Sequence, residues 1–196
     1  MGKEFEFYYD YVSPTSYLAW TQLPALVQRT GASVLYKPAL LGGIFKSTGN
    51  RAPISVPAKG VWLANDMARF ATRYGVTFNM HPNFPFSSVY LMRGAIKALQ
   101  MGVIEDFNTV MFNGIWVDNA DMTDPSALGK MLNKAGIDSQ AIMASMQDPE
   151  IKQALFDRTE EAVAKGLFGM PTFLVGGELH WGQDRIDFVE EALLRS

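Results

Sequence analysis

The chain has 196 residues, with 17 basic side chains, 20 acidic side chains and no cysteine. The lack of cysteine excludes disulfides, thiolate metal sites and dithiol redox chemistry within the chain. The net charge of −3 includes no basic run, so we expect neither a nucleic-acid partner nor a membrane partner. Charged residues near the N-terminus occupy the place of a signal peptide's apolar segment, so we expect a cytoplasmic protein.

The N-terminal segment predicts a strand, a helix and a second strand. Phe5, Phe7 and Tyr9 alternate with other residues, as in a strand with one buried face. Pro14 fits the first turn of a helix over residues 14–30, and Gly31 is a suitable C-terminal stop. Residues 34–36 form the second predicted strand, so the three elements fit a right-handed βαβ unit.

Ser13 stands at the corner between the first strand and this helix. Such a corner offers unpaired backbone N–H groups and the positive end of a helix dipole, which together suit an anion such as a thiolate. Because the chain has no cysteine, a thiolate can only come from a ligand. An ordinary N-cap is the more common role of a serine here, and the two roles are geometrically compatible.

The middle of the chain contains two parts with different sequence patterns. Residues 38–58 contain several glycines and prolines and predict a long, largely irregular loop, which usually has a function in a compact domain. Residues 60–165 are mostly helical by pattern, with a first helix ending at Gly75 and a turn-rich connector over residues 81–86. Further helices are predicted over residues 87–101, 104–116, 125–135, 139–146 and 149–165.

The C-terminal part returns to strands. Residues 172–175 and 178–181 flank a Gly-Gly pair, which indicates a two-residue hairpin, and a helix follows over residues 184–194. The element order predicts an α/β protein with a thioredoxin-like fold and a large all-helical insertion. We place the thioredoxin-like domain at residues 1–58 and 166–196 and the inserted helical domain at residues 59–165.

Four motifs resemble one enzyme family. They are residues 7–18 (FYYDYVSPTSYL), 41–50 (LGGIFKSTGN), 168–173 (FGMPTF) and 181–185 (WGQDR). In this order and spacing they are similar to the DsbA-like glutathione enzymes, which comprise 2-hydroxychromene-2-carboxylate isomerases and kappa-class glutathione S-transferases. The resemblance spans essentially the whole chain. It implies a DsbA-like thioredoxin fold, glutathione as cofactor and a homodimer.

The resemblance also implies how the sulfur and the peptide backbone of glutathione are held. Ser13 matches the serine that hydrogen-bonds the glutathione sulfur, and a hydroxyl donor at a helix N-terminus lowers the pKa of a thiol. Met170 and Pro171 match the family's cis-proline site, where the backbone before the proline pairs with the tripeptide. Few X-Pro bonds are cis, so this expectation depends on the match alone.

Four further positions match the two ends of glutathione. Asn50 and Lys59 match residues that hold it, and the Lys59 ammonium suits the glycine carboxylate. Gln183 and Asp184 match the site of the γ-glutamyl end, with amide donors for its carboxylate and the Asp184 carboxylate for its ammonium. A solvated loop charge is the alternative for Lys59, and complementation of a helix dipole is the alternative for Asp184.

The implied reaction interconverts 2-hydroxychromene-2-carboxylate and trans-o-hydroxybenzylidenepyruvate, in the breakdown of naphthalene-type aromatics. A thiolate that adds to the conjugated enone leaves a single bond that can rotate, and elimination restores the alkene. Asp10 fits either proton transfer or an Asx-turn, and Lys46 could meet the substrate carboxylate or face solvent. The aromatic residues near the motifs are Phe45, Phe84, Phe86, Phe168 and Trp181.

Two other functions stay open. One is a kappa-class-like glutathione transferase or peroxidase, which would share the glutathione site but consume the thiol. The other is a non-catalytic thioredoxin-fold module that binds peptides beside its cis-proline. No metal is expected, because His81 and His180 are far apart and no metal-ligand spacing occurs.

Overall fold

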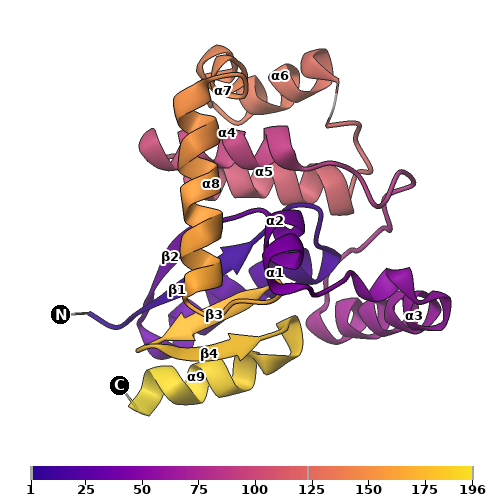
Figure 1. The fold of residues 1–196 in the computed structure, drawn as a ribbon, viewed down its shortest axis with the longest axis vertical. Helices are drawn as coiled ribbons and strands as arrows, with labels where there is room; N and C mark the ends of the chain where they lie inside the picture. Colours follow the sequence, from indigo (N-terminus) through magenta and orange to yellow (C-terminus); the bar gives the residue numbers. More distant parts are fainter. Residues whose placement is uncertain (1, 123, 196) are drawn as a thin grey trace.

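The structure, a computed structural model, describes residues 2–122 and 124–195. A four-stranded sheet has helices against both faces (Figure 1). The helices of residues 89–145 form a further stack, in the upper part of Figure 1. The strands are β1 (Glu4–Tyr9), β2 (Ser33–Pro38), β3 (Thr172–Val175) and β4 (Glu178–Trp181), in the order β2-β1-β3-β4. β1 and β2 are parallel, whereas β3 is antiparallel to both β1 and β4.

Apart from a helix over residues 41–48, the α-helices follow the predicted order. The helices are α1 (Pro14–Thr30), α2 (Leu41–Thr48), α3 (Pro57–Tyr74), α4 (Val89–Gln100), α5 (Ile104–Trp116), α6 (Pro125–Lys134), α7 (Ser139–Ser145), α8 (Pro149–Ala164) and α9 (Ile186–Arg195), with short 3-10 helices η1 (Pro53–Ser55) and η2 (Gln183–Arg185). The helix predicted from residue 184 thus begins as η2 before α9. None of the described helices is both long and apolar enough to cross a bilayer.

The alternation of β1 divides the core between the two faces of the sheet. Phe5, Phe7 and Tyr9 belong to the large core cluster that includes buried side chains of α1 and α9. Tyr8 points to the other face, where it packs with Ile44 of α2 and Ala162 of α8. This is the period of two expected of a strand, and here both faces are covered.

The prediction of an irregular loop over residues 38–58 is wrong for α2 and η1. Glycine disfavours a helix, but tertiary contacts override that preference here. Ile44 is fully buried, and the Leu41 N–H at the first turn of α2 donates to Asp10 Oδ2 at 2.9 Å. Gly43 allows α2 to approach α8, since a Cβ there would lie 2.8 Å from Thr159 Cγ2.

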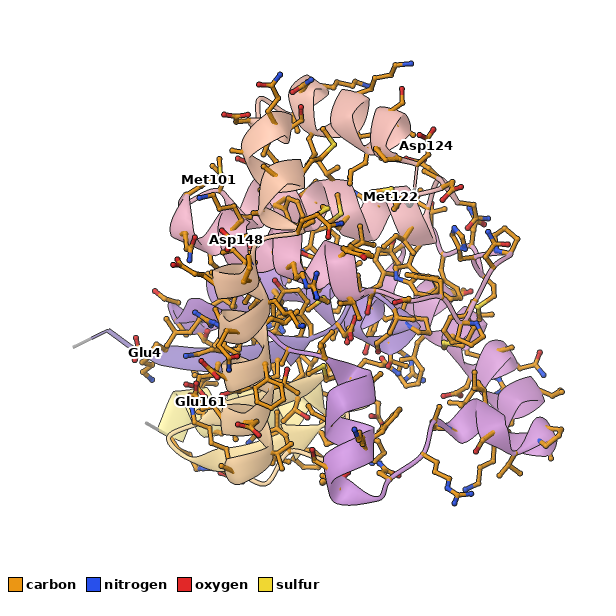
Figure 2. All side chains as sticks on the ribbon, turned by 45° about the horizontal axis from the view of Figure 1, so that its top comes forward. Glu4, Met101, Met122, Asp124, Asp148 and Glu161 are labelled. Carbon is orange, nitrogen blue, oxygen red and sulfur yellow. The ribbon has the colours of Figure 1, made fainter. Side chains whose placement is uncertain are left out.

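Helix α8 connects the stacked helices with the sheet. It begins at the N-cap Asp148 and descends to the sheet, with Glu161 in its last turns (Figure 2). Lys165, directly after it, pairs with Glu6 of β1 at 2.9 Å. The predicted domain boundary at 165/166 therefore follows α8, and the one at 58/59 falls in the first turn of α3; the division itself stays a prediction.

Candidate functional site

A cavity of about 1120 Å³ opens where β1 ends and α1 begins. Its walls come from α2, the start of α3, the connector before α4, the loop before β3, and the end of β4 with η2. All the site residues predicted from the sequence line this one cavity: Ser13, Asn50, Lys59, Met170, Pro171, Gln183 and Asp184. The fold thus brings together positions that lie as far apart as residues 13 and 184.

Ser13 is the buried N-cap of α1. Its Oγ accepts a hydrogen bond from the Ser16 N–H at 3.1 Å, as a capping side chain does. The same Oγ lies 3.4 Å from the carbonyl oxygen of Met170 and 3.0 Å from Thr15 Oγ1. Ser13 is only 3% exposed, so its hydroxyl sits in a site with little competing water, at the positive end of a helix.

The loop before β3 faces this serine. The peptide bond between Met170 and Pro171 is cis, as the sequence comparison with the family implied. The carbonyl oxygen of Met170 faces the hydroxyls of Ser13 and Thr15. The Met170 N–H donates to no group among the described residues, so it is available to pair with the backbone of a ligand.

Gln183 and Asp184, in η2, form another part of the cavity wall. Gln183 is buried, and both its side-chain Oε1 and its carbonyl oxygen accept from Tyr74 Oη at 2.9 Å. With Oε1 held by Tyr74, the amide N–H groups of Gln183 are its remaining side-chain donors. Asp184 is exposed and lies 3.5 Å from Arg185 Nη2. This wall therefore offers amide donors beside a carboxylate.

Asn50 and Lys59 differ in how tightly they are held. The Asn50 amide donates to the Phe168 carbonyl at 2.8 Å and accepts from the Arg51 N–H at 2.8 Å, which joins the α2 end to the loop before β3. Lys59 is exposed in the first turn of α3, and no ion pair involves it within the described residues. A cation without a partner at the cavity wall can receive a carboxylate.

Asp10 lines the cavity and is only 1% exposed. Its Oδ1 accepts from the Val12 N–H at 3.1 Å, which is the Asx-turn expected from the sequence, and its Oδ2 accepts from Leu41. The side chain of Ser88, the N-cap residue of α4, also hydrogen-bonds the carboxyl. Burial raises the pKa of Asp10, although these hydrogen bonds oppose the rise. Asp10 thus joins three walls of the cavity.

The remaining lining is mainly apolar. Of the aromatics noted in the sequence, Phe45, Phe84, Phe86 and Trp181 line the cavity, whereas Phe168 packs on the Trp181 ring at a centroid distance of 5.0 Å. Lys46 is not among the lining residues. An apolar wall opposite a few polar groups is typical of a small-molecule site.

Three polar residues of the site were not identified from the sequence. Tyr74 holds Gln183, Ser88 holds Asp10, and Thr15 lies beside Ser13. No sequence pattern could pair residues 74 and 183, because their contact depends on how α3 packs against η2. Thr15 could have been noticed, since a second hydroxyl two residues after Ser13 falls in the same helical turn.

Comparisons with known proteins show the family and the fold of the chain. The family description "DSBA-like thioredoxin domain" matches residues 4–194. The 2-hydroxychromene-2-carboxylate isomerase of Sphingobium xenophagum is 32% identical over 197 residues, covering 99% of this chain and 100% of the relative. Glutathione S-transferase kappa 1 of Homo sapiens is 28% identical, covering 96% of this chain and 89% of the relative.

A solved structure of 2-hydroxychromene-2-carboxylate isomerase has a TM-score of 0.89 and 26% identity, covering 98% of this chain and 95% of that one. The relatives are enzymes with two different named activities on one fold. The chain therefore belongs to the family of 2-hydroxychromene-2-carboxylate isomerases and kappa-class glutathione S-transferases, which has a DsbA-like thioredoxin fold.

Proposed function

We propose that the protein is a glutathione-dependent cis–trans isomerase that interconverts 2-hydroxychromene-2-carboxylate and trans-o-hydroxybenzylidenepyruvate. The observation that carries the proposal is the buried Ser13 hydroxyl at the N-terminus of α1, in a cavity lined by every residue matched to glutathione binding. Relatives named for the isomerase, of which one is 32% identical, support the choice of reaction.

The residues of the cavity fit glutathione in charge and in hydrogen bonding. Lys59 offers a cation for the glycine carboxylate, and the Met170 N–H is free to pair with the peptide backbone. Gln183 and Asp184 offer amide donors and a carboxylate for the γ-glutamyl end. The volume of about 1120 Å³ exceeds the ~300–1000 Å³ usual for one small ligand, so a tripeptide and an aromatic substrate can share it.

Bound glutathione would supply the nucleophilic thiolate, whose reversible addition to the conjugated alkene permits rotation. Ser13 donates its proton toward that anion, and the N-terminus of α1 adds a favourable dipole. Phe45 and Phe84 exclude water from the wall of the cavity, which strengthens both effects. Asp10 keeps the turn before Ser13 and the start of α2 in place.

Two measurements test the proposal. Calorimetry should detect glutathione binding to the full chain, and no binding at millimolar ligand would favour the peptide-binding module instead. With binding shown, an assay on 2-hydroxychromene-2-carboxylate should give the open-chain product with all glutathione recovered. Loss of free thiol together with a conjugate or a reduced peroxide would instead establish the kappa-type activity, which the 28% identical human relative favours.

The proposal also includes a cytoplasmic homodimer without nucleic-acid or membrane partners. Helix α3 carries exposed apolar side chains such as Val61 and Trp62, which are 68% and 57% exposed. They offer an apolar surface for contact with a second copy of the chain. Light scattering over a range of protein concentrations tests the dimer. Cell fractionation tests the location.

A further inference from the structure

The proposed reaction moves a proton that the thiolate does not carry. In 2-hydroxychromene-2-carboxylate the ring is closed as a hemiketal, and ring opening breaks the bond between the hemiketal carbon and the ring oxygen. The hemiketal hydroxyl loses its proton as the keto group forms, and the ring oxygen gains a proton as it becomes a phenol. Because addition of the sulfur only permits rotation about the carbon–carbon bond, ring opening needs a proton carrier of its own.

Asp10 is the acidic group that stands at the right place for this task. Among the described residues that line the cavity, it is the one ionisable side chain that is buried. Its carbonyl oxygen accepts from the Ser13 N–H at 3.0 Å, so Asp10 lies at the corner where the sulfur is expected. Burial raises the pKa of Asp10, which makes its carboxylate a stronger base than an exposed aspartate.

Ser88 connects this carboxylate to the cavity. A serine at an N-cap usually accepts a hydrogen bond from the first turn of its helix, but the Ser88 side chain makes no such bond to α4. It hydrogen-bonds the Asp10 carboxyl instead, and since a carboxylate only accepts, Ser88 is the donor. Ser88 lines the cavity two residues after the aromatic Phe86. The lone pairs of its oxygen are thus available to a proton of the substrate.

We infer that Ser88 and Asp10 form a proton relay for ring opening. The Ser88 oxygen takes the hemiketal proton while its own proton passes to the Asp10 carboxylate. The keto group forms, the bond to the ring oxygen breaks, and the proton returns from Asp10 through Ser88 to the ring oxygen, which becomes the phenol. The protein gains and loses no proton overall, and no other reactant is needed. The inference rests on the proposed function, because it assigns the ring-opening step of that reaction.

The test compares two substrates, of which only one needs this proton. The first is 2-hydroxychromene-2-carboxylate. The second is the cis isomer of o-methoxybenzylidenepyruvate, whose methyl ether prevents ring closure, so that its conversion requires rotation alone. We expect Ser88→Ala to lower turnover of the first substrate about 100-fold, the lower end of what general acid–base catalysis contributes, and to change turnover of the second little. Ser88→Thr, which keeps the hydroxyl, should restore turnover of the first substrate.

Ser87→Ala is the matched control, because Ser87 is the exposed neighbour that also lines the cavity. It should keep wild-type turnover of both substrates. An equal loss on both substrates in Ser88→Ala would show that Ser88 only supports the shape of the cavity, and no loss on either would show that ring opening needs no carrier. Each of these two results overturns the inference. If Ser88→Ala does not fold, as judged by thermal unfolding, Ser88→Gly takes its place, since glycine is well tolerated at an N-cap.

The same assays distinguish failure of the inference from failure of the proposed function. If wild-type protein with glutathione converts neither substrate, the proposed function fails and the relay fails with it. If wild-type protein converts both substrates with all glutathione recovered, and Ser88→Ala shows no selective loss on the ring-closed substrate, only the relay is wrong.

Discussion

At the scale of single residues, the proposed function gives Ser13 a chemical task in addition to its structural one as the N-cap of α1. Its Oγ accepts from the Ser16 N–H and thereby caps α1, while its one proton is directed by the neighbouring acceptors. The two tasks use different parts of the hydroxyl, a lone pair and the proton. Capping is therefore compatible with the proposed catalytic role at this position, and a substitution should affect stability and turnover separately.

Ser13→Ala should lower turnover about 10- to 100-fold, which corresponds to one hydrogen bond to a charged group. The affinity for glutathione should change less, because the rest of the tripeptide keeps its contacts. Loss of the cap should also cost about 1 kcal/mol of unfolding free energy. Steady-state kinetics, calorimetry and urea unfolding measure the three effects.

Asp124→Ala is the matched control for lost capping. Asp124, labelled in Figure 2, caps α6 by accepting from the Ser126 N–H at 2.9 Å. It is not among the residues that line the cavity. This variant should lose a similar amount of stability and keep wild-type turnover. Wild-type turnover in Ser13→Ala would mean that the serine is only a cap.

At the scale of elements, α2 shows how packing can reverse a local preference. Its two glycines disfavour a helix, yet the helix forms and buries Ile44, and Gly43 lets it approach α8 closely. Thr159 on α8 cannot easily move away, since its Oγ1 accepts from the Leu40 N–H at 3.0 Å and donates to the Leu155 carbonyl at 2.8 Å. The position of this cavity wall thus depends on one missing methyl group.

Gly43→Ala should destabilise the protein by about 1–3 kcal/mol through overpacking against Thr159. Gly42→Ala is its matched control on the same helix, because a Cβ at Gly42 meets nothing within 4 Å. That variant should gain up to about 1 kcal/mol from the better helix propensity of alanine. Urea unfolding of both variants checks the pair, and equal changes would contradict the role of Gly43.

At the scale of the whole molecule, one core joins the sheet to the helical insertion. Tyr9 and Tyr11 both donate to Asn108 Oδ1 of α5, at 2.8 and 2.6 Å, and the Trp116 indole donates to the Tyr11 carbonyl at 3.0 Å. Their rings and Phe112 belong to one buried cluster. The inserted helices therefore complete the core of the thioredoxin-like part instead of forming a separate one.

We therefore expect the whole chain to unfold in a single cooperative transition. Far-ultraviolet circular dichroism reports mainly on the helices, and tryptophan fluorescence reports on Trp20 in α1 and Trp116 in α5, together with the more exposed Trp62 and Trp181. The urea transitions by both probes should coincide. Two separated transitions would instead show that residues 59–165 unfold as an independent domain.

The ion pairs between β1 and the end of α8 make stability depend on pH. Burial raises the pKa of Glu6, but hydrogen bonds from Lys165 and Tyr8 and the charge of Lys37 outweigh it, and the net pKa lies below the usual 4.5. A carboxylate with a lowered pKa stabilises the fold above its unfolded pKa, and the benefit is lost as pH falls through the folded pKa.

Glu6→Gln should therefore cost about 1 kcal/mol near pH 7, a small value because the pairs are partly exposed. The difference from wild type should shrink as the pH falls through the lowered folded pKa of Glu6, because the carboxylate then becomes protonated and the ion pairs are lost. Urea unfolding at pH 7 and at acidic pH measures it. Glu4→Gln is the control on the same strand (Figure 2), since Glu4 makes no ion pair within the described residues, and a loss of equal size there would contradict the assignment.

The sequence by itself determined the features that depend on neighbours along the chain. Four such features are present in the structure: the alternation in β1, the N-cap Ser13, the helix stop at Gly31 and the Gly-Gly hairpin. Each depends on contacts within a few residues. The matched motifs also pointed to the residues that line the cavity. Composition alone established that any thiol must come from outside the chain.

Only the tertiary structure decided the features that depend on distant segments. Helix α2 packs closely against α8 because Gly43 leaves room for Thr159, and Gln183 is oriented because Tyr74 reaches it from α3. The Ser13, Thr15 and Met170 group forms only when the loop before β3 folds against the start of α1. Local propensities carry no information about these contacts, because the free energy of the contacts comes from packing between segments more than 100 residues apart.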